Sequence, residues 1–319
     1  MLLYSLLIIA GILFLYFGAE MLIRGSVRMA LALGVTPLII GLTIVSLGTS
    51  LPEGVASLMA QLAGGRGNIA VGNILGSNIA NVGLILGLTA IFYPLNITSD
   101  LIRRETPIML GISLLLGVFM WDMRITTVEG IILIALMALY FVFQVWYSKQ
   151  AQVKFPPDAI VEQYKESMRP NGKLWVNIMF VVIGLGILIL GGGMLLEGSV
   201  GAARILGLSD RVIGITIFAI GTSSPEMATS LVAAYRREMD ISVGNVVGSN
   251  IMNVVFIIGL VACVKEIVFE PKLLSLDFPI MVAFSVAMYI MMIVWKKIHR
   301  LGGVVLLLGY IGYIVFLLQ

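Results

Sequence analysis

Two residue types that often bind metal ions are almost missing from this 319-residue chain, which has one cysteine and one histidine. A single cysteine excludes an internal disulfide and any site built from several thiolates. Zinc and copper prefer imidazole and thiolate ligands, so the scarcity of both argues against a zinc or copper centre. A metal ion bound by this chain would have to be held by oxygen atoms.

Charged residues are also scarce. They make up 12% of the chain, hydrophobic residues make up 60%, and the mean hydropathy is +1.07. A soluble domain is nearer half apolar, so this composition predicts a polytopic membrane protein with the lipid bilayer as its main partner. The net charge of +3 is too small to indicate nucleic acid, and no obligate protein partner is evident.

Two polar sequence motifs each occur twice in this apolar chain. Residues 41–53 read GLTIVSLGTSLPE and residues 214–226 read GITIFAIGTSSPE, with eight of thirteen positions identical. Residues 72–81 read GNILGSNIAN and residues 244–253 read GNVVGSNIMN, with seven of ten identical. The same offset relates MLIRGS at 21–26 to MLLEGS at 194–199, which indicates duplication of a whole half.

The apolar runs, each near the length that crosses a bilayer, predict an all-α fold with ten transmembrane helices. The expected spans are residues 2–29, 36–63, 68–92, 105–121, 126–147, 174–204, 210–237, 240–265, 276–295 and 301–318. Residues 1–147 then form the first five-helix repeat and residues 174–319 the second. The hydrophilic residues 148–173 between them are expected to be a linker.

Five spans are an odd number, so the second repeat must enter the membrane from the opposite side, which gives two inverted repeats. Assigning loops to alternate sides places fourteen of the twenty Lys and Arg residues on the side of the linker. Loops that stay in the cytoplasm carry the excess of basic residues. We therefore expect a multi-pass protein of the cell membrane with a cytoplasmic linker and both termini outside.

Glu53 and Glu226 lie well inside the second and seventh expected spans. An ionised carboxylate there costs roughly 2.5 to 3.5 kcal/mol, and no Lys or Arg within the motifs can compensate it. A cation that is not part of the chain is the expected partner. Glu20 and Glu197, near span ends and not aligned with each other, are expected to face water.

The residues around these glutamates suit a hard cation. Pro52 and Pro225 cannot donate a helical hydrogen bond, so each predicts a broken helix with carbonyl groups free to face a cavity. Asn73, Ser77 and Asn81 recur at intervals of four and form an oxygen stripe, repeated in the second half as Asn245, Ser249 and Asn253. Ca²⁺ accepts six to eight such oxygen ligands, and two carboxylates balance its charge.

GTSLPE and GTSSPE, paired with GSNIAN and GSNIMN, closely resemble the two alpha-repeats of the cation/calcium antiporter superfamily, above all its sodium/calcium exchanger branch of prokaryotic type. The resemblance covers both halves and implies ten spans in an inverted arrangement. It implies a secondary active antiporter that exchanges Na⁺ for Ca²⁺ by alternating access. Such a protein is not an enzyme and needs no cofactor, because Ca²⁺ and Na⁺ are its cargo.

The resemblance also implies roles for residues of the two motifs. Glu53 and Glu226 would bind Ca²⁺, helped by the backbone carbonyl groups of Thr49 and Thr222. Na⁺ would use the motif serines and nearby groups. In this sequence those positions are Ser50, Ser223, Ser77, Ser249, Asn81 and Asn253, with carbonyl groups at Ser46 and Ala219.

Alternatives remain at this point. Two glutamates can accept two protons in place of one Ca²⁺, so a Ca²⁺/H⁺ antiporter is the nearest, although the proton-coupled branch typically has Gly-Asn where this chain has Gly-Thr-Ser twice. Potassium cotransport is disfavoured because position 253 is an amide and not an acid. A channel fits the duplication less well. An intramembrane protease would need a catalytic set within the spans, and none is apparent.

Overall fold

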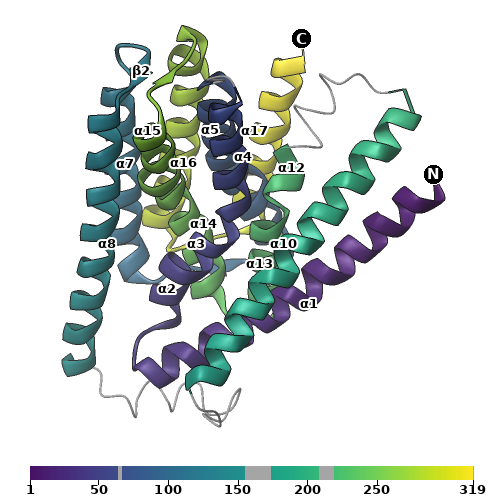
Figure 1. The fold of residues 1–319 in the computed structure, drawn as a ribbon. Coiled ribbons are helices and arrows are strands. Elements are labelled where there is room, and N and C mark those ends of the chain that lie inside the picture. Colours follow the sequence, from purple (N-terminus) through teal and green to yellow (C-terminus); the bar gives the residue numbers. More distant parts are fainter. Residues whose placement is uncertain (64–66, 155–173, 208–218, 319) are drawn as a thin grey trace.

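The apolar runs fold as helices in the computed structural model, which describes residues 1–63, 67–154, 174–207 and 219–318 (Figure 1). Among these residues, seven helices are long and apolar enough to cross a membrane. A bent pair, Pro37–Thr49 and Leu51–Leu62 with 41° between them, brings the number to eight if it counts as one span. Only two short two-stranded sheets interrupt the helical fold of the described residues.

The described part of the first half contains α-helices and three π-helical segments, which are labelled η. Its elements are α1 (Leu2–Leu33), α2 (Pro37–Ile40), η1 (Gly41–Val45), α3 (Ser46–Thr49), α4 (Leu51–Leu62), α5 (Gly67–Ala80), η2 (Asn81–Leu86), α6 (Gly87–Phe92), β1 (Leu95–Asn96), η3 (Leu101–Glu105), α7 (Thr106–Phe119), β2 (Arg124–Ile125) and α8 (Thr127–Lys154).

The second half repeats this order. Its elements are α10 (Leu174–Ile205), α12 (Ala219–Thr222), α13 (Ser224–Tyr235), α14 (Met239–Met252), η5 (Asn253–Ile258), α15 (Gly259–Val264), β3 (Ile267–Val268), η6 (Leu273–Asp277), α16 (Phe278–Trp295), β4 (Lys297–Ile298) and α17 (Arg300–Leu318). Equivalent elements often have the same length, such as 12 residues for α4 and α13 and 14 for α5 and α14. The duplication seen in the sequence is therefore a structural repeat.

The two sheets join the halves crosswise. β1 pairs with β4, and β2 pairs with β3, both antiparallel. The sheets lie at opposite ends of the bundle, so the equivalent strands β1 and β3 lie at opposite ends too (Figure 1). Both chain ends lie toward the upper half of Figure 1, whereas the ends of α8 and α10 that flank residues 155–173 lie at the bottom.

Two of the apolar spans form the buried centre of the bundle. The span from α5 to α6 is 78% buried and the span from α14 to α15 is 83% buried, whereas the outer helices α8, α16 and α17 are between 22% and 28% buried. The outer helices and the loops beside them expose many large apolar side chains, including Trp121, Trp146 and Phe316. A surface of this kind is suited to contact lipid.

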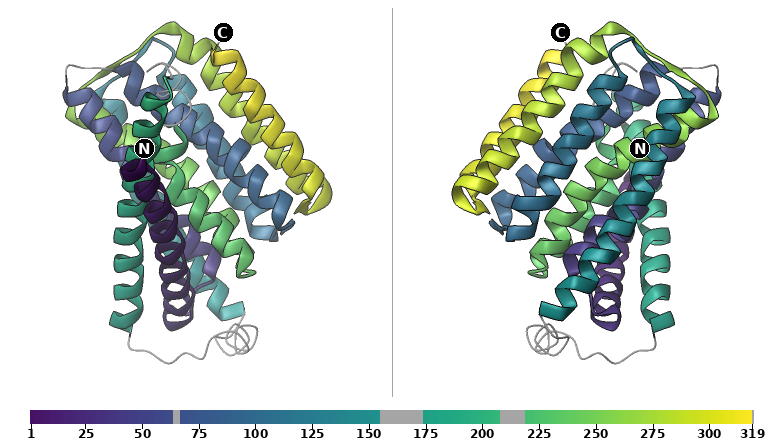
Figure 2. Two further views of the ribbon diagram at one scale, coloured as in Figure 1. Left: turned by 90° about the vertical axis from the view of Figure 1, so that its right-hand side faces the viewer. Right: turned by 90° about the vertical axis from the view of Figure 1, so that its left-hand side faces the viewer.

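α1 and α10 form a long antiparallel pair that crosses the rest of the bundle at an angle (Figures 1 and 2). Glycines every seven residues line their contact. A Cβ on Gly18 would lie 2.8 Å from the backbone nitrogen of Leu188, and one on Gly184 would lie 2.6 Å from that of Leu22. Only glycine allows the two backbones to approach this closely.

The helices differ from the expected spans in a few places. α1 continues to Leu33, beyond residue 29, and α8 continues to Lys154, so the first residues of the expected linker are helical. Residues 155–173 of the linker and residues 210–218 of the seventh expected span lie outside the described residues.

The expectation that Glu20 faces water was wrong, whereas Glu197 is exposed as expected. Glu20 is only 8% exposed because it pairs with two arginines. Arg24 lies one turn away on α1, and Arg236 follows α13, with its Nη2 2.5 Å from Glu20 Oε1. This ion pair joins α1 to the end of α13.

Candidate ion-binding site

The two motif glutamates lie at equivalent breaks in two helices. Ser50 separates α3 from α4, and Ser223 separates α12 from α13. Both serines have nearly the same backbone angles, φ −80° and ψ 1° for Ser50 and φ −88° and ψ 10° for Ser223. A proline in the first turn after each break explains it, as the sequence predicted.

Glu53 and Glu226 therefore lie in the first turns of α4 and α13, where the positive end of the helix dipole favours a carboxylate. Each is 1% exposed. The two carboxyl groups belong to one site, because the serine three residues before each glutamate donates a hydrogen bond to the other glutamate. Two like charges in a buried site are stable only if a cation or protons compensate them.

The halves exchange hydrogen bonds at this point. The Ser50 hydroxyl donates to Glu226 Oε1 over 3.2 Å, and the Ser223 hydroxyl donates to Glu53 Oε1 over 3.2 Å. Each carboxylate is thus oriented by the serine of the opposite repeat. Because both serines act as donors, their oxygen lone pairs remain available to a cation.

Several buried side-chain oxygens have no hydrogen-bond partner among the described residues, and four of them occur in matched pairs at the two motifs. These four are Glu53 Oε2, Glu226 Oε2, Asn81 Oδ1 and Asn253 Oδ1. α13 packs against η2 and α4 packs against η5, so each glutamate helix contacts the segment that begins with the asparagine of the other repeat. A buried acceptor that lacks a donor is costly unless a cation or water satisfies it.

The other residues predicted to bind through backbone carbonyl groups belong to the segments just before the two breaks. The Thr49 hydroxyl donates to the Val45 carbonyl group over 3.1 Å, and the Ser46 hydroxyl donates to that of Leu42 over 2.8 Å. Both hydroxyl groups therefore donate to the backbone of their own bent segment. Thr222 is buried at the end of α12. Ala219 begins α12, and its side chain lies outside the described residues.

The expected oxygen stripe divides into two parts. Asn73 and Asn245 support the glutamate helices, because their Nδ2 atoms donate to the carbonyl groups of Glu53 and Glu226 over 3.2 and 3.3 Å. Ser77 and Ser249 are both buried, and the Ser249 hydroxyl has no partner among the described residues.

A cavity of about 560 Å³ lies between α4, α5 and α17. Asn73 and Ser77 form part of its wall at the inner side, and Tyr313 and Leu317 form part of it near the C-terminus. The cavity therefore connects the region of the first-half motif with the end of the bundle where the C-terminus lies.

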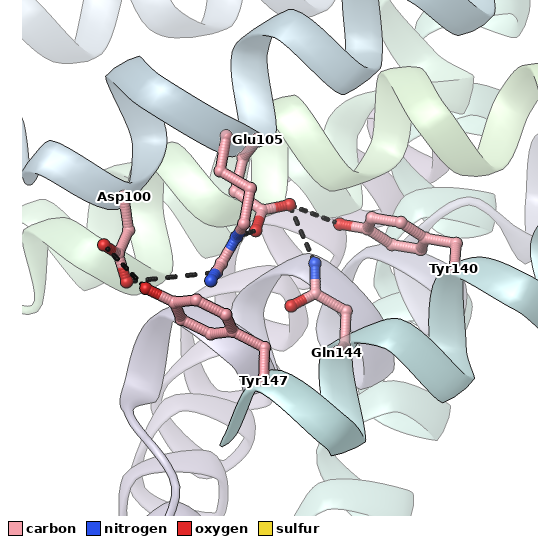
Figure 3. Close-up of polar contacts among 6 residues, drawn as sticks. Asp100, Glu105, Tyr140, Gln144 and Tyr147 are labelled. Atoms are coloured by element: carbon pink, nitrogen blue, oxygen red, sulfur yellow. Dashed lines mark hydrogen bonds and ion pairs between the residues drawn. The ribbon is translucent and has the colours of Figure 1, made fainter. Parts of the chain in front are cut away.

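A second buried polar cluster, which the sequence reasoning missed, lies between η3 and α8 (Figure 3). The Glu105 side chain is 0% exposed and accepts hydrogen bonds from Tyr140 over 2.9 Å and Gln144 over 2.8 Å. Arg104 pairs with it and stacks on the Tyr147 ring. In the second half, Tyr313 donates over 2.7 Å to Asp277, which is the equivalent of Glu105.

Comparison with known proteins agrees with this geometry. The family model described as "Sodium/calcium exchanger protein" matches residues 3–146 and 176–319, which are almost the two repeats. The chain is 36% identical to the inner membrane protein YrbG of Escherichia coli K12 over 320 residues, covering 99% of this chain and 97% of that protein. It is 30% identical to the sodium/calcium exchanger MaX1 of Methanosarcina acetivorans over 343 residues, covering 98% and 97%.

Among solved structures, the sodium/calcium exchanger from Methanococcus jannaschii has the same fold, with a TM-score of 0.83 and 28% identity over 98% of each chain. The same exchanger without Na⁺ and Ca²⁺ gives a TM-score of 0.84 at 29% identity over 99% of each chain. The family model covers most of this chain, and these relatives match it from end to end. The chain is a membrane protein that belongs to the sodium/calcium exchanger family.

Proposed function

We propose that this protein is a secondary active antiporter that uses Na⁺ entry to expel Ca²⁺ by alternating access. The observation that carries the proposal is the matched set of buried oxygens without donors, two from carboxylates and two from amides. Their total charge of −2 is balanced by one Ca²⁺ or by sodium ions in its place. Because the charged site is unfavourable when empty, binding of one ion species must replace the other, which couples their movement.

The ligands proposed for Ca²⁺ are the carboxylates of Glu53 and Glu226 and the carbonyl groups of Thr49 and Thr222. The groups proposed to hold Na⁺ or to line the site are Ser50, Ser223, Ser77, Ser249, Asn81 and Asn253, with the carbonyl groups of Ser46 and Ala219. All are oxygen ligands, as hard cations require. The donor–acceptor pattern of Ser50 and Ser223 supports this assignment, since each leaves a lone pair beside a carboxylate.

We propose ten transmembrane helices in two inverted five-helix repeats, in the cell membrane, with both termini outside and the linker in the cytoplasm. The position of β1 and β3 at opposite ends of the bundle supports the inversion. In this orientation the cavity beside α17 opens toward the outside. The α1–α10 pair, held together by its glycines and lying across the bundle, is the proposed moving gate.

Transport by the purified protein in lipid vesicles tests the proposal. Radioactive Ca²⁺ uptake should follow an imposed Na⁺ gradient. It should fall at least about 100-fold in Glu53→Gln and in Glu226→Gln, because removing one partner of a buried charge pair costs about 3 to 5 kcal/mol. Glu197→Gln, which changes an exposed carboxylate, is the matched control and should transport at the normal rate.

Two results would contradict the proposal. Uptake that follows a pH gradient and ignores Na⁺ would identify a Ca²⁺/H⁺ antiporter. Full-rate Ca²⁺ transport by the double variant Glu53→Gln/Glu226→Gln would remove the carboxylates from the mechanism altogether.

A further inference from the structure

Four buried asparagines form reciprocal contacts between the halves, next to the proposed ion site. Asn81 Nδ2 donates to Asn250 Oδ1 over 3.0 Å, and Asn253 Nδ2 donates to Asn78 Oδ1 over 2.9 Å. All four are at most 2% exposed. Asn78 and Asn250 are the first asparagines of the two GSNxxN motifs, and the transport proposal gives them no role.

These hydrogen bonds decide which way two amide groups face. Because Asn81 and Asn253 use their nitrogen atoms to reach the opposite half, their Oδ1 atoms remain without a donor among the described residues. Rotating either amide by half a turn would bring two oxygens together, Oδ1 against Oδ1, and would present N–H groups to a cation. Both changes are unfavourable, so the partner oxygen holds the amide in its orientation.

Asn78 and Asn250 are themselves oriented by sulfur atoms. Asn78 Nδ2 contacts Met281 Sδ at 3.6 Å and the backbone carbonyl oxygen of Asn250 at 3.3 Å. Asn250 Nδ2 contacts Met109 Sδ at 3.7 Å. A thioether can accept a hydrogen bond weakly but cannot donate one, so it favours the amide nitrogen on its side and leaves the amide oxygen for the other half.

We infer that Asn78 and Asn250 are positioning residues for ion binding. Each fixes the amide of the opposite repeat, Asn78 that of Asn253 and Asn250 that of Asn81, so that its oxygen faces the transported cation. This inference rests on the proposed function, since it concerns the same cations. It also means that each half completes the ligand set of the other through an asparagine, as it does through Ser50 and Ser223.

A double-mutant cycle distinguishes positioning from packing. Asn78→Leu keeps the volume but removes the acceptor, and should raise the KM for Ca²⁺ about 10-fold, which corresponds to one hydrogen bond of about 1.4 kcal/mol. In an Asn253→Asp background the same change should raise KM less than about threefold, because a carboxylate presents an oxygen in either orientation. Asn250→Leu with Asn81→Asp gives an independent cycle in the other half.

Three controls complete the design. Met281→Leu removes one of the two acceptors of Asn78 Nδ2 and keeps the Asn250 backbone carbonyl group, so it should raise KM less than Asn78→Leu does. Melting temperatures show whether each variant folds. Equilibrium binding of radioactive Ca²⁺ to the purified protein repeats the comparison without any Na⁺ gradient, so a driving ion other than Na⁺ contradicts the transport proposal and still tests Asn78 and Asn250.

Two outcomes overturn the positioning role. One is an equal effect of Asn78→Leu on KM and Ca²⁺ affinity in the wild-type and Asn253→Asp backgrounds. The other is a lower maximal rate and melting temperature with an unchanged KM, which would mean that the asparagines only pack the two halves together. A wild-type protein that neither binds nor moves Ca²⁺ would overturn both proposals at once.

Discussion

The two copies of the site have almost the same residues but different neighbours. In the first copy, none of the described residues lies within 4 Å of the place where a Cβ on Gly76 would be, and Ser77 lines the cavity. In the second copy, a Cβ on the equivalent Gly248 would lie 2.7 Å from the Leu42 carbonyl oxygen and 2.7 Å from Ser46 Oγ. η1 and α3 cover α14 there, whereas residues 208–218, which include the counterpart of η1, lie outside the described residues.

Among the described residues, the two copies therefore differ in packing and not in chemistry. An inverted repeat with two nearly identical surfaces, one open and one covered, has a second arrangement of similar energy in which they exchange roles. The following predictions test where the two halves are equivalent and where they are not.

The largest effect is expected at the α1–α10 contact, where the halves are equivalent. Gly184→Leu would force a side chain into the backbone of α1 and should lower the free energy of unfolding by about 3 kcal/mol, measured by thermal melting in detergent. Gly11→Leu, its counterpart, should cost about the same. Gly186→Leu is the control, since nothing lies within 4 Å of its Cβ position. Equal melting of Gly184→Leu and Gly186→Leu would contradict close packing.

The next effect should separate the halves. Gly248→Ala meets the backbone of η1 and should lower the free energy of unfolding by about 2 kcal/mol, whereas Gly76→Ala meets none of the described residues and should cost less. Both variants should nevertheless slow Ca²⁺ exchange by roughly 10-fold, because the second state covers Gly76 as this one covers Gly248. Full activity in Gly76→Ala would argue against exchange of the two surfaces.

A smaller difference in the free energy of unfolding is expected between the Tyr313–Asp277 pair of the second half and the Tyr140–Glu105 pair of the first. Tyr313→Phe removes the only hydrogen bond that the Asp277 carboxylate makes among the described residues, and should cost about 1.5 kcal/mol. Tyr140→Phe leaves Glu105 bonded to Arg104 and Gln144, and should cost about 0.5 kcal/mol. Chemical or thermal unfolding of the two variants measures both. The reverse order would mean that the richer cluster of the first half depends on Tyr140.

The smallest effect concerns the turn between α13 and α14. Burial, and then the nearby charge of Asp240, raise the pKa of Glu238 to about 7. A carboxyl group with a raised pKa stabilises the fold most below its ordinary pKa of 4.5, and this contribution is lost as the pH rises through about 7. Glu238→Gln should therefore raise the melting temperature at pH 8 by up to about 2 °C, and less at pH 5. An equal shift at both pH values would contradict this cause.

Much of the site could be predicted because its chemistry is local. The proline of each motif predicts the break at Ser50 and Ser223, and a buried carboxylate in an apolar run predicts a cation partner for Glu53 and Glu226. The pairing of Ser50 with Glu226 could not be predicted, because the two residues are 176 positions apart and only the crossing of the halves brings them together.

Other features gave a signal that was easy to misread. Glu105 follows two arginines at a span end, which is typical of a surface residue, yet it is fully buried. Its alignment with Asp277, two residues before the shared Pro-Ile-Met, was the available clue. Asn73 and Asn81 look alike on a helical stripe, and only their hydrogen-bond acceptors, the Glu53 carbonyl group for Asn73 and the Asn250 amide for Asn81, separate a support from a candidate ligand.

Each half supplies a serine hydroxyl that donates to the glutamate of the other half, and this has a consequence for how the protein is synthesised. Ser223 follows Glu53 by 170 residues, so a ribosome adding about 5 to 20 residues per second completes the pair roughly 10 to 30 s after the glutamate is synthesised. During that interval a nascent first half placed in the bilayer lacks its counterpart. Its acidic group must be protonated, held near the headgroups or shielded by the insertion machinery until the second half arrives.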